Sequence, residues 1–207
     1  MGTFHSMDVY FVRHGITRWN IEKRYMGHSD ERLLAQELHT LYPLRRALEN
    51  IPFDYYYCSD LKRCIETFQY LLPNELVCLD SRLREIHFGE WEGLTYEDLK
   101  RDHMYQAWLT DFEKKAPPNG ETFQQFNDRI NFFLAELQSR QNASNSKILI
   151  VTHGGVIRAL MKHLKLIMTF WDIQVKHGTA YCLSFQHQRG KWVCNSWSEV
   201  PIQGKEK

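Results

Sequence analysis

The chain has 207 residues, of which 43% are hydrophobic and 25% are charged, and its formal net charge is +1. This length suits one domain with a substantial core, and the composition is typical of a soluble globular protein. The near-neutral charge argues against a nucleic-acid or membrane-surface binder, and no uncharged apolar run reaches the roughly 18 residues of a membrane span.

Strand and helix patterns alternate along the chain. The short apolar run at residues 9–12 predicts a buried strand, and residues 33–48 predict a helix that Pro43 kinks or breaks. Further strands are expected at residues 55–58, 76–79, 148–151, 181–185 and 192–194. Further helices are expected at residues 60–71 with Ser59 as N-cap, 95–109 as one or two helices, 121–141 and 156–164. The alternation predicts an α/β fold, a three-layer α/β/α sandwich with a mostly parallel sheet.

The five cysteines are Cys58, Cys64, Cys78, Cys182 and Cys194. They form no C-x-x-C pair and their number is odd, which predicts reduced, mostly buried thiols in a cytoplasmic protein. Residues 1–6 carry no apolar signal segment, and we interpret them as a cloning remnant or a disordered terminus. We expect a single domain over residues 7–200, as a monomer or homodimer.

Four segments carry reactive side chains just beyond predicted strands or on loops between elements. They read R-H-G at residues 13–15, S-D-L-K-R at 59–63, L-R-E-I-H-F-G-E-W-E-G at 83–93 and T-H-G-G at 152–155. Ligands of open α/β sheets bind outside the carboxyl ends of the strands. The strand-end histidines His14 and His153 are therefore expected to meet at one point if their strands are parallel neighbours.

Two histidines with arginines around them suit a phosphoryl group, which needs a nucleophile in line and positive donors on its oxygens. His14 is the candidate nucleophile, through a neutral ring nitrogen that forms a phosphohistidine. Arg13 and Arg63 can hold phosphate oxygens with their planar donor forks, and a protonated His153 would stabilise developing charge. The amide of Asn20 can also donate to the phosphate.

Glu85 is the candidate acid, which protonates the leaving oxygen and then activates water. Glu90 and Glu92 lie close in sequence and remain alternatives. Gly15, Gly154 and Gly155 permit tight turns and close backbone approach, and we place Gly154 among the substrate-binding residues.

Other polar and aromatic residues have simpler interpretations. We interpret His87 as a packed or rim residue, and Trp91 and Trp108 as either lining a substrate mouth or packing. The ten histidines raise the alternative of a zinc site, but no H-E-x-x-H or C-x-x-C spacing supports one. We therefore expect no metal and no cofactor.

Together, R-H-G-x-T-x-x-N, S-D-L-x-R, the acidic segment and T-H-G-G resemble the histidine phosphatase superfamily, also called phosphoglycerate-mutase-like, from Asp8 to about Trp197. The resemblance implies the same roles for the matched residues. From His87 to Phe123 the chain is most similar to the α-ribazole phosphatases and their broad-specificity relatives. The chain departs from the family pattern at one residue and in one segment. Ile16 replaces an acidic or amide residue, and D-E-R-L-L-A-Q-E at residues 30–37 replaces D-x-P-L-T-x-x-G.

The expected function is hydrolysis of a small phosphate monoester, and the resemblance makes α-ribazole 5'-phosphate in cobalamin synthesis the candidate substrate. The alternatives are a broad-specificity acid or sugar phosphatase, a phosphoglycerate mutase, and a binding protein with an inactive site. Mutases of this family carry extra basic sequence between the acidic segment and the T-H-G segment. In this chain that interval, residues 93–147, is short, which favours hydrolysis. Residues 88–96 and 105–123 are rich in aromatics and poor in positive charge, which favours a partly apolar substrate body over a second anionic group.

Overall fold

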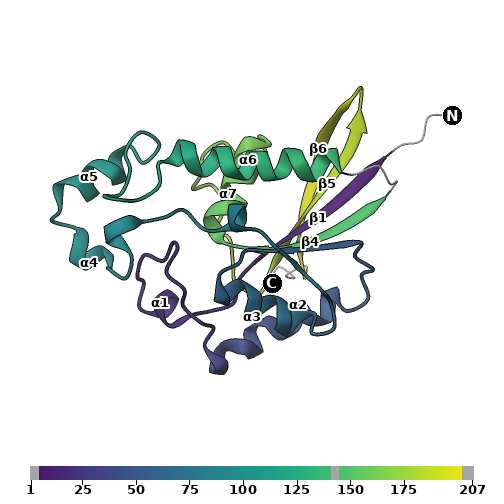
Figure 1. Cartoon of the computed structure of the whole chain (residues 1–207), viewed down its shortest axis with the longest axis horizontal. Coiled ribbons are helices and arrows are strands. Elements are labelled where there is room, and N and C mark those ends of the chain that lie inside the picture. The colour runs from purple at the N-terminus through teal and green to yellow at the C-terminus, as the bar shows by residue number, and fades with distance from the viewer. Residues whose placement is uncertain (1–4, 141–144, 202–207) are drawn as a thin grey trace, which may run out of the picture.

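The computed structural model describes residues 5–140 and 145–201. Its centre is a six-stranded sheet in the order β3-β2-β4-β1-β5-β6 (Figure 1). The strands are β1 (Ser6–Arg13), β2 (Tyr55–Cys58), β3 (Cys78–Leu79), β4 (Ser146–Thr152), β5 (Ala180–Gln188) and β6 (Lys191–Val200). The first four strands pair in parallel, whereas β5 runs antiparallel to both β1 and β6. The predicted, mostly parallel sheet is therefore confirmed.

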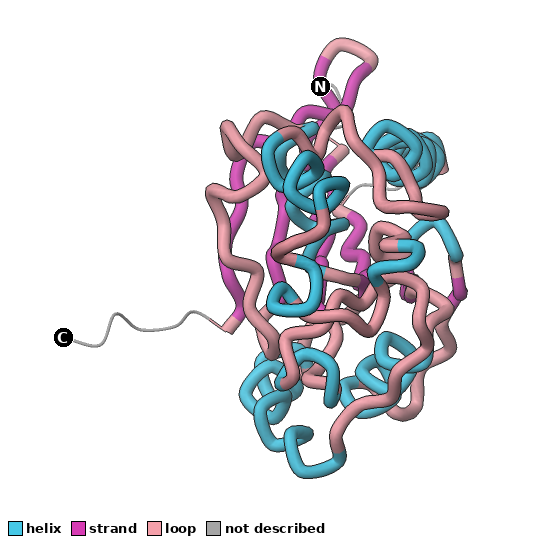
Figure 2. The backbone as a smooth tube through the Cα atoms, turned by 90° about the vertical axis from the view of Figure 1, so that its left-hand side faces the viewer, coloured by secondary structure: helices cyan, strands magenta, loops and turns pink. Residues whose placement is uncertain are grey.

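Helices cover both faces of this sheet, as Figures 1 and 2 show. The α-helices are α1 (Arg18–Ile21), α2 (Tyr42–Leu48), α3 (Lys62–Leu71), α4 (Tyr96–Leu99), α5 (His103–Thr110), α6 (Phe123–Ser139) and α7 (Gly154–His163), and short 3-10 helices span Ala35–Leu41, Ser81–Leu83 and Gly89–Trp91. One face is covered by α2 and α3, and the other by α6 and α7. This arrangement confirms the three-layer sandwich.

The core against the sheet divides into two apolar clusters, one on each face, because side chains alternate along β1 and β4. Val9 and Ile150 pack into the cluster beneath α6 and α7, whereas Val12 and Val151 belong to the cluster beneath α2 and α3. Both faces of these central strands are buried, which explains why they appear in the sequence as unbroken apolar runs.

Several predicted boundaries hold in outline and shift in detail. The stretch at residues 33–48 breaks as expected: the 3-10 helix ends at Leu41, and Pro43 lies in the first turn of α2, where its missing N–H has no partner to lose. Residues 95–109 form two helices, α4 and α5. The third strand is shorter than predicted because only Cys78 and Leu79 pair with β2.

The prediction that Ser59 caps α3 is wrong. The helix begins at Lys62 after Leu61, whose side chain offers no acceptor, and the Lys62 N–H donates instead to Oδ1 of Asp30 at 2.7 Å. The acceptor therefore comes from a segment some thirty residues earlier, and Ser59 is free to contact His153 instead.

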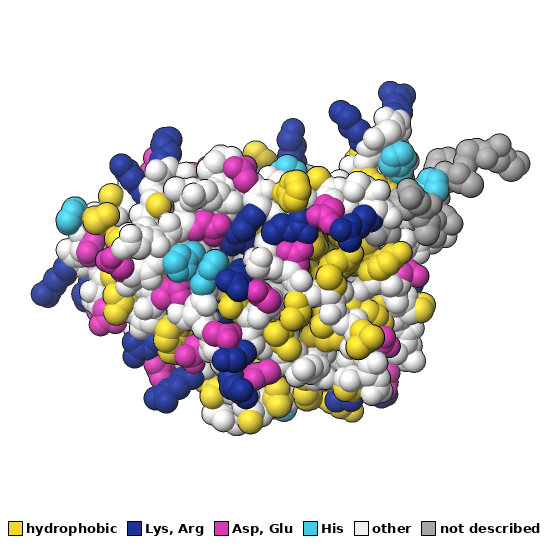
Figure 3. Space-filling model, viewed as in Figure 1, with side chains coloured by type: hydrophobic (Ala, Val, Ile, Leu, Met, Phe, Trp, Pro, Cys, Tyr) yellow, Lys and Arg dark blue, Asp and Glu magenta, His cyan; other side chains and the backbone are white. Residues whose placement is uncertain are grey.

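At the amino end, Ser6 is the first residue of β1, and Met7 is fully buried. Residues 1–4, on which the expectation of a cloning remnant partly falls, lie outside the described residues. On the face shown in Figure 3, basic and acidic side chains are interspersed without a broad surface of one sign. In residues 5–140 and 145–201 no helix combines the length and apolar character needed to cross a membrane.

Candidate active site

The pairing register of β1 and β4 brings the two strand-end histidines together. Arg13 lies opposite Thr152, so the next residue of each strand, His14 and His153, leaves the sheet at the same level. The His14 N–H donates to the Thr152 carbonyl at 2.9 Å, and the two imidazole rings lie 5.2 Å apart between centroids. The expectation that these histidines meet at the carboxyl edge of the sheet is confirmed.

The His14 ring is buried and held by its own loop. Its Nδ1 lies 2.7 Å from the Gly15 carbonyl oxygen, so Nδ1 carries the proton and donates it, which leaves Nε2 with a free lone pair. Burial and the nearby positive charges of Arg63 and Arg13 hold the pKa of His14 well below its usual value. A neutral ring with an unprotonated Nε2 is the state that a histidine nucleophile requires.

His153 is fully buried at the start of α7. Its Nε2 lies 2.9 Å from Oγ of Ser59 and 3.4 Å from Sγ of Cys64. Burial and the charge of Arg63 hold the pKa of His153 well below its usual value, so the ring is neutral at pH 7 in this structure. The sequence hypothesis required a protonated His153, and that state would need the charge of a bound anion.

Two arginines flank the histidine pair, each partly occupied by backbone carbonyls. Nη1 of Arg13 donates to the Val175 carbonyl at 2.7 Å. Nη1 and Nη2 of the fully buried Arg63 donate to the carbonyls of Ser29 and Gly27, both at 2.7 Å. The Nε–H groups of both arginines are buried and have no hydrogen-bond partner. A buried donor without an acceptor is costly, and a phosphate oxygen would satisfy it.

The Glu85 side chain contacts the first turn of α7. Its Oε2 accepts a hydrogen bond of 2.9 Å from the Gly155 N–H, and its Oε1 accepts from the Ile86 N–H at 3.0 Å. Arg129 of α6 fixes the same loop, because its Nη2 donates to the Glu85 carbonyl at 2.8 Å and its guanidinium pairs with Glu121. The carboxyl group is thus oriented by backbone on both sides.

The two alternative acids have different surroundings. Glu92 accepts hydrogen bonds from the backbone N–H groups of His28 and Ser29 at 2.7 and 2.6 Å, and it is engaged as a structural acceptor. Burial opposes its ionisation, but these hydrogen bonds prevail and lower the pKa of Glu92. Glu90 pairs with the side chain of Asn119 at an exposed position. Neither carboxylate shares the contacts of Glu85 with α7.

The remaining predicted residues occupy supporting positions. Asn20 completes a capping box with Thr17: its Oδ1 accepts from the Thr17 N–H and hydroxyl, which leaves the amide NH₂ as a donor. A Cβ at Gly155 would lie 2.0 Å from Glu85 Oε1, so close approach does require glycine there. A Cβ at Gly154 would lie 3.5 Å from Arg13 Nε, an ordinary contact, so no protein atom requires glycine there, and its place among the substrate-binding residues stays a prediction.

Beside Glu85 lies a cavity of about 290 Å³ with mostly aromatic walls. It is lined by Tyr25, Glu85, Ile86, Phe88, Trp108, Leu109, Phe112, Phe123, Phe126, Arg158, Phe170 and Trp171. Several of these residues come from the two segments that the sequence indicated as the substrate mouth. A larger cavity of about 430 Å³, beside His187 and Trp192, is lined by none of the predicted site residues.

The two tryptophans with open interpretations pack in the same aromatic cluster. Trp91 is 2% exposed and lies 5.3 Å from the Tyr105 ring and 5.5 Å from the Trp108 ring, whereas Trp108 both packs there and lines the aromatic cavity. His87 lies at the surface beside His28, with 4.7 Å between ring centroids, as expected for a rim residue.

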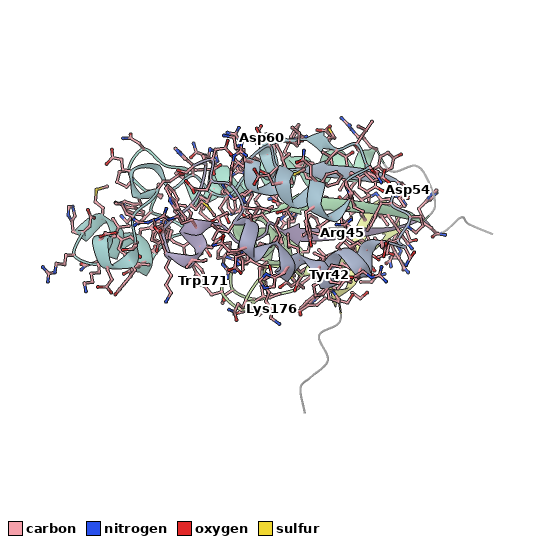
Figure 4. The ribbon with its side chains drawn as sticks, turned by 90° about the horizontal axis from the view of Figure 1, so that it is seen from below. Tyr42, Arg45, Asp54, Asp60, Trp171 and Lys176 are labelled. Carbon is pink, nitrogen blue, oxygen red and sulfur yellow. The ribbon has the colours of Figure 1, made fainter. Side chains whose placement is uncertain are left out.

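Sequence reasoning missed the contribution of residues 164–179, between α7 and β5. Figure 4 shows Trp171 and Lys176 of this segment along one edge of the molecule, opposite Asp60. The segment also supplies His177, whose Nδ1 donates to the His14 carbonyl at 2.6 Å and whose ring lies 5.5 Å from that of His14. Burial and Arg13 lower the pKa of His177 to about 4. No motif or periodicity in the segment signalled this contact.

Metal ligands are not clustered in the part of the chain that the structure describes: no group of three or more His, Cys, Asp or Glu side chains there could hold an ion. Positive charge at the histidine pair comes from arginines. Burial lowers the pKa of Arg13 to about 10, which still leaves the guanidinium charged at neutral pH.

A buried histidine pair flanked by arginines, with an oriented carboxyl group beside it, suits phosphoryl transfer, because it supplies a nucleophile, positive charge and a general acid. A family model described as "Histidine phosphatase superfamily (branch 1)" matches residues 9–200, and the chain belongs to this family. The phosphatase class predicted from the motifs is confirmed.

Similar proteins include both phosphatases and mutase-like proteins. The chain is 35% identical over 178 residues to the adenosylcobalamin/alpha-ribazole phosphatase of Escherichia coli strain K12, which covers 83% of this chain and 87% of that protein. It is 32% identical over 200 residues to phosphoglycerate mutase-like protein 4 of Arabidopsis thaliana, with 93% and 85% covered. The crystal structure of the alpha-ribazole phosphatase from Shigella flexneri superposes with a TM-score of 0.82 at 30% identity, with 95% and 98% covered.

Proposed function

We propose that this protein hydrolyses a small phosphate monoester through a phosphohistidine on His14. In the first step Nε2 of His14 attacks phosphorus, the bond between phosphorus and the ester oxygen breaks, and Glu85 donates a proton to that oxygen. In the second step the Glu85 carboxylate takes a proton from water. The water oxygen attacks phosphorus, and the N–P bond breaks to release inorganic phosphate.

The other site residues bind and stabilise the phosphoryl group. The unpartnered Nε–H groups of Arg13 and Arg63 supply donors for its oxygens. The Gly154 N–H lies at the amino terminus of α7, where the helix dipole favours an anion, and the Asn20 amide and a His153 N–H add further donors. One observation carries this proposal: a buried His14 has Nδ1 tied to the Gly15 carbonyl and its lone pair on Nε2, between two arginines with unsatisfied donors.

We propose α-ribazole 5'-phosphate, in cobalamin synthesis, as the substrate, and the name of the adenosylcobalamin/alpha-ribazole phosphatase relative supports this proposal. The cavity beside Glu85 supports this choice, because aromatic walls suit a ring-bearing leaving group better than a second anion. A broad-specificity phosphatase is the alternative within this class. The test is a panel of monoesters: kcat/KM should be higher for α-ribazole 5'-phosphate than for 3-phosphoglycerate. A tenfold preference for the phosphoglycerate, about 1.4 kcal/mol of transition-state binding, would refute the proposal.

We also propose a cytoplasmic location and a monomer or homodimer that requires no nucleic acid, membrane, metal or cofactor. The five cysteines are free, and three of them are buried, which suits a reducing compartment. Light scattering after size exclusion would distinguish a monomer from a dimer. Localisation in a fractionated native host would test the compartment, and recovery of the protein in a membrane or secreted fraction would contradict it.

A further inference from the structure

Arg158 places a positive charge inside the aromatic cavity beside Glu85. Its side chain projects from α7, and its Nε donates to the Ile173 carbonyl at 3.1 Å. The guanidinium carbon lies 5.3 Å from the ring centroid of Trp171 and 5.7 Å from that of Phe170. The stacked rings and the carbonyl together hold the planar guanidinium in one orientation, with Nη1 and Nη2 as the remaining donors.

Glu85 and Arg158 line the same cavity. Burial lowers the pKa of Arg158, and the negative charge of Glu85 partly opposes this lowering. In the proposed reaction Glu85 protonates the ester oxygen, so the body of the leaving group occupies this cavity. A leaving group in the cavity therefore meets the Glu85 carboxyl group, the Arg158 guanidinium and the aromatic wall together.

A guanidinium surrounded by apolar walls favours one kind of occupant. A purely hydrocarbon leaving group would displace water from the Arg158 donors and offer them no acceptor, which is costly. A leaving group with hydroxyl or ring-nitrogen acceptors would pair these donors while its ring packs on the aromatic wall. Sites built to hydrogen-bond a substrate group discriminate strongly against analogues that lack the group.

We propose that Arg158 is a specificity-determining residue that selects leaving groups with hydrogen-bond acceptors, such as sugar hydroxyls, placed between the ester oxygen and an aromatic ring. This inference rests on the proposed phosphatase function and assigns a chemical requirement to its cavity. A nucleoside-like 5'-phosphate meets the requirement with both parts, whereas benzyl phosphate has only the ring and ribose 5-phosphate has only the hydroxyls.

The test uses these three esters, with α-ribazole 5'-phosphate as the nucleoside-like substrate, on the purified full chain. Arg158→Met keeps an apolar stem and removes the donors, and it should lower kcat/KM by about 10–100-fold for the two ribosyl esters, mainly through KM. For benzyl phosphate the loss should be about threefold or less. Trp171→Ala should show the complementary pattern, with losses for the two aromatic esters that exceed the loss for ribose 5-phosphate.

Two further variants control for charge and folding. Arg158→Lys keeps the charge and loses the fork, so its losses should follow the same order of substrates at smaller size. Arg46→Gln removes a surface arginine that pairs with Glu49 on the α2 side of the molecule, and it should match the wild type on all three esters.

Several results would overturn this inference. Equal losses for benzyl phosphate and the ribosyl esters in Arg158→Met would show that Arg158 only supports the wall or the phosphate site. Unchanged kcat/KM for all three esters, or a larger loss with 3-phosphoglycerate than with ribose 5-phosphate, would also contradict it. A wild-type enzyme that hydrolyses none of the esters would instead contradict the proposed function, and the inference would fall with it.

Discussion

Gly155 and Glu85 are in direct contact: the Gly155 N–H donates to Glu85 Oε2 at 2.9 Å, and a Cβ at Gly155 would lie 2.0 Å from Oε1. The first turn of α7 thus holds the proposed acid, while His153, the residue just before this helix, faces His14. A side chain at residue 155 would occupy the place of the Glu85 carboxyl group, so the second glycine of the T-H-G-G segment is required for steric reasons. The side chain that imposes this requirement, Glu85, is about 70 residues away in the sequence.

Gly155→Ala should therefore displace Glu85 and slow the hydrolysis of alkyl phosphates by about 10²–10⁴, the range expected for losing general acid–base catalysis. Gly154→Ala is the matched control, because its Cβ would make only an ordinary contact with Arg13. Steady-state kinetics on ribose 5-phosphate would measure both. A loss at residue 154 that equals or exceeds the loss at residue 155 would contradict this explanation.

Glu85→Gln should slow hydrolysis of alkyl phosphates by about 10²–10⁴. With p-nitrophenyl phosphate, whose leaving group needs little protonation, the initial burst should persist while steady-state turnover falls, because the second step still needs a base. Rapid-quench kinetics would separate the two phases.

Glu90→Gln is the control for this experiment, since Glu90 pairs with Asn119 at the surface. It should retain turnover close to that of the wild type. Wild-type rates in Glu85→Gln together with a loss in Glu90→Gln would show that the acid is misassigned.

His177 should make the protein less stable at acidic pH. Its pKa is lowered to about 4, so between about pH 6.5 and pH 4 an unfolded chain binds a proton that the folded chain does not. The free energy of unfolding should therefore decrease as the pH falls through this window, by up to about 1.4 kcal/mol per pH unit for this group. His14 and His153, whose pKa values are also lowered, act in the same direction.

The variant His177→Asn should flatten this dependence by up to about one proton, since asparagine does not titrate and can still donate to the His14 carbonyl. Urea unfolding at pH 7, 6 and 5 would measure the slope for both proteins. If the two slopes are equal, His177 does not resist protonation in the folded state.

Activity should survive dialysis against a chelator. The phosphate-binding charge in the proposed mechanism comes from Arg13 and Arg63, whose unpartnered Nε–H groups point to an anion rather than a cation. Turnover of p-nitrophenyl phosphate before and after EDTA treatment would be compared. A loss of activity that zinc or magnesium restores would contradict a metal-free mechanism.

The features that were predictable from the sequence are those fixed by local patterns. The apolar runs at residues 9–12 and 148–151 predicted two strands, which the structure pairs in parallel, and the apolar spacing from Phe123 to Leu137 predicted α6 to within two residues at each end. The meeting of His14 and His153 follows from the register of two parallel strands, which a strand-end motif anticipates.

Features created by distant segments were not predictable in this way. The acceptor at the start of α3 is Asp30 rather than Ser59, because chain folding brings a remote carboxylate there. Arg158 and His177 enter the site through α7 and the segment after it, and neither lies at the end of a predicted strand. Their roles depend on packing that pattern analysis of a single sequence does not contain.

The most direct test of the central claim is the chemical identification of the phosphoenzyme. The enzyme would be mixed with p-nitrophenyl phosphate, quenched at alkaline pH and digested, and its peptides analysed by mass spectrometry. The phosphoryl group should be found on His14, be acid-labile, be absent in His14→Ala and accumulate in Glu85→Gln, where the second step is slowed. Turnover without a labelled peptide, a label on His153, or robust labelling of the His14→Ala variant would contradict the proposed mechanism.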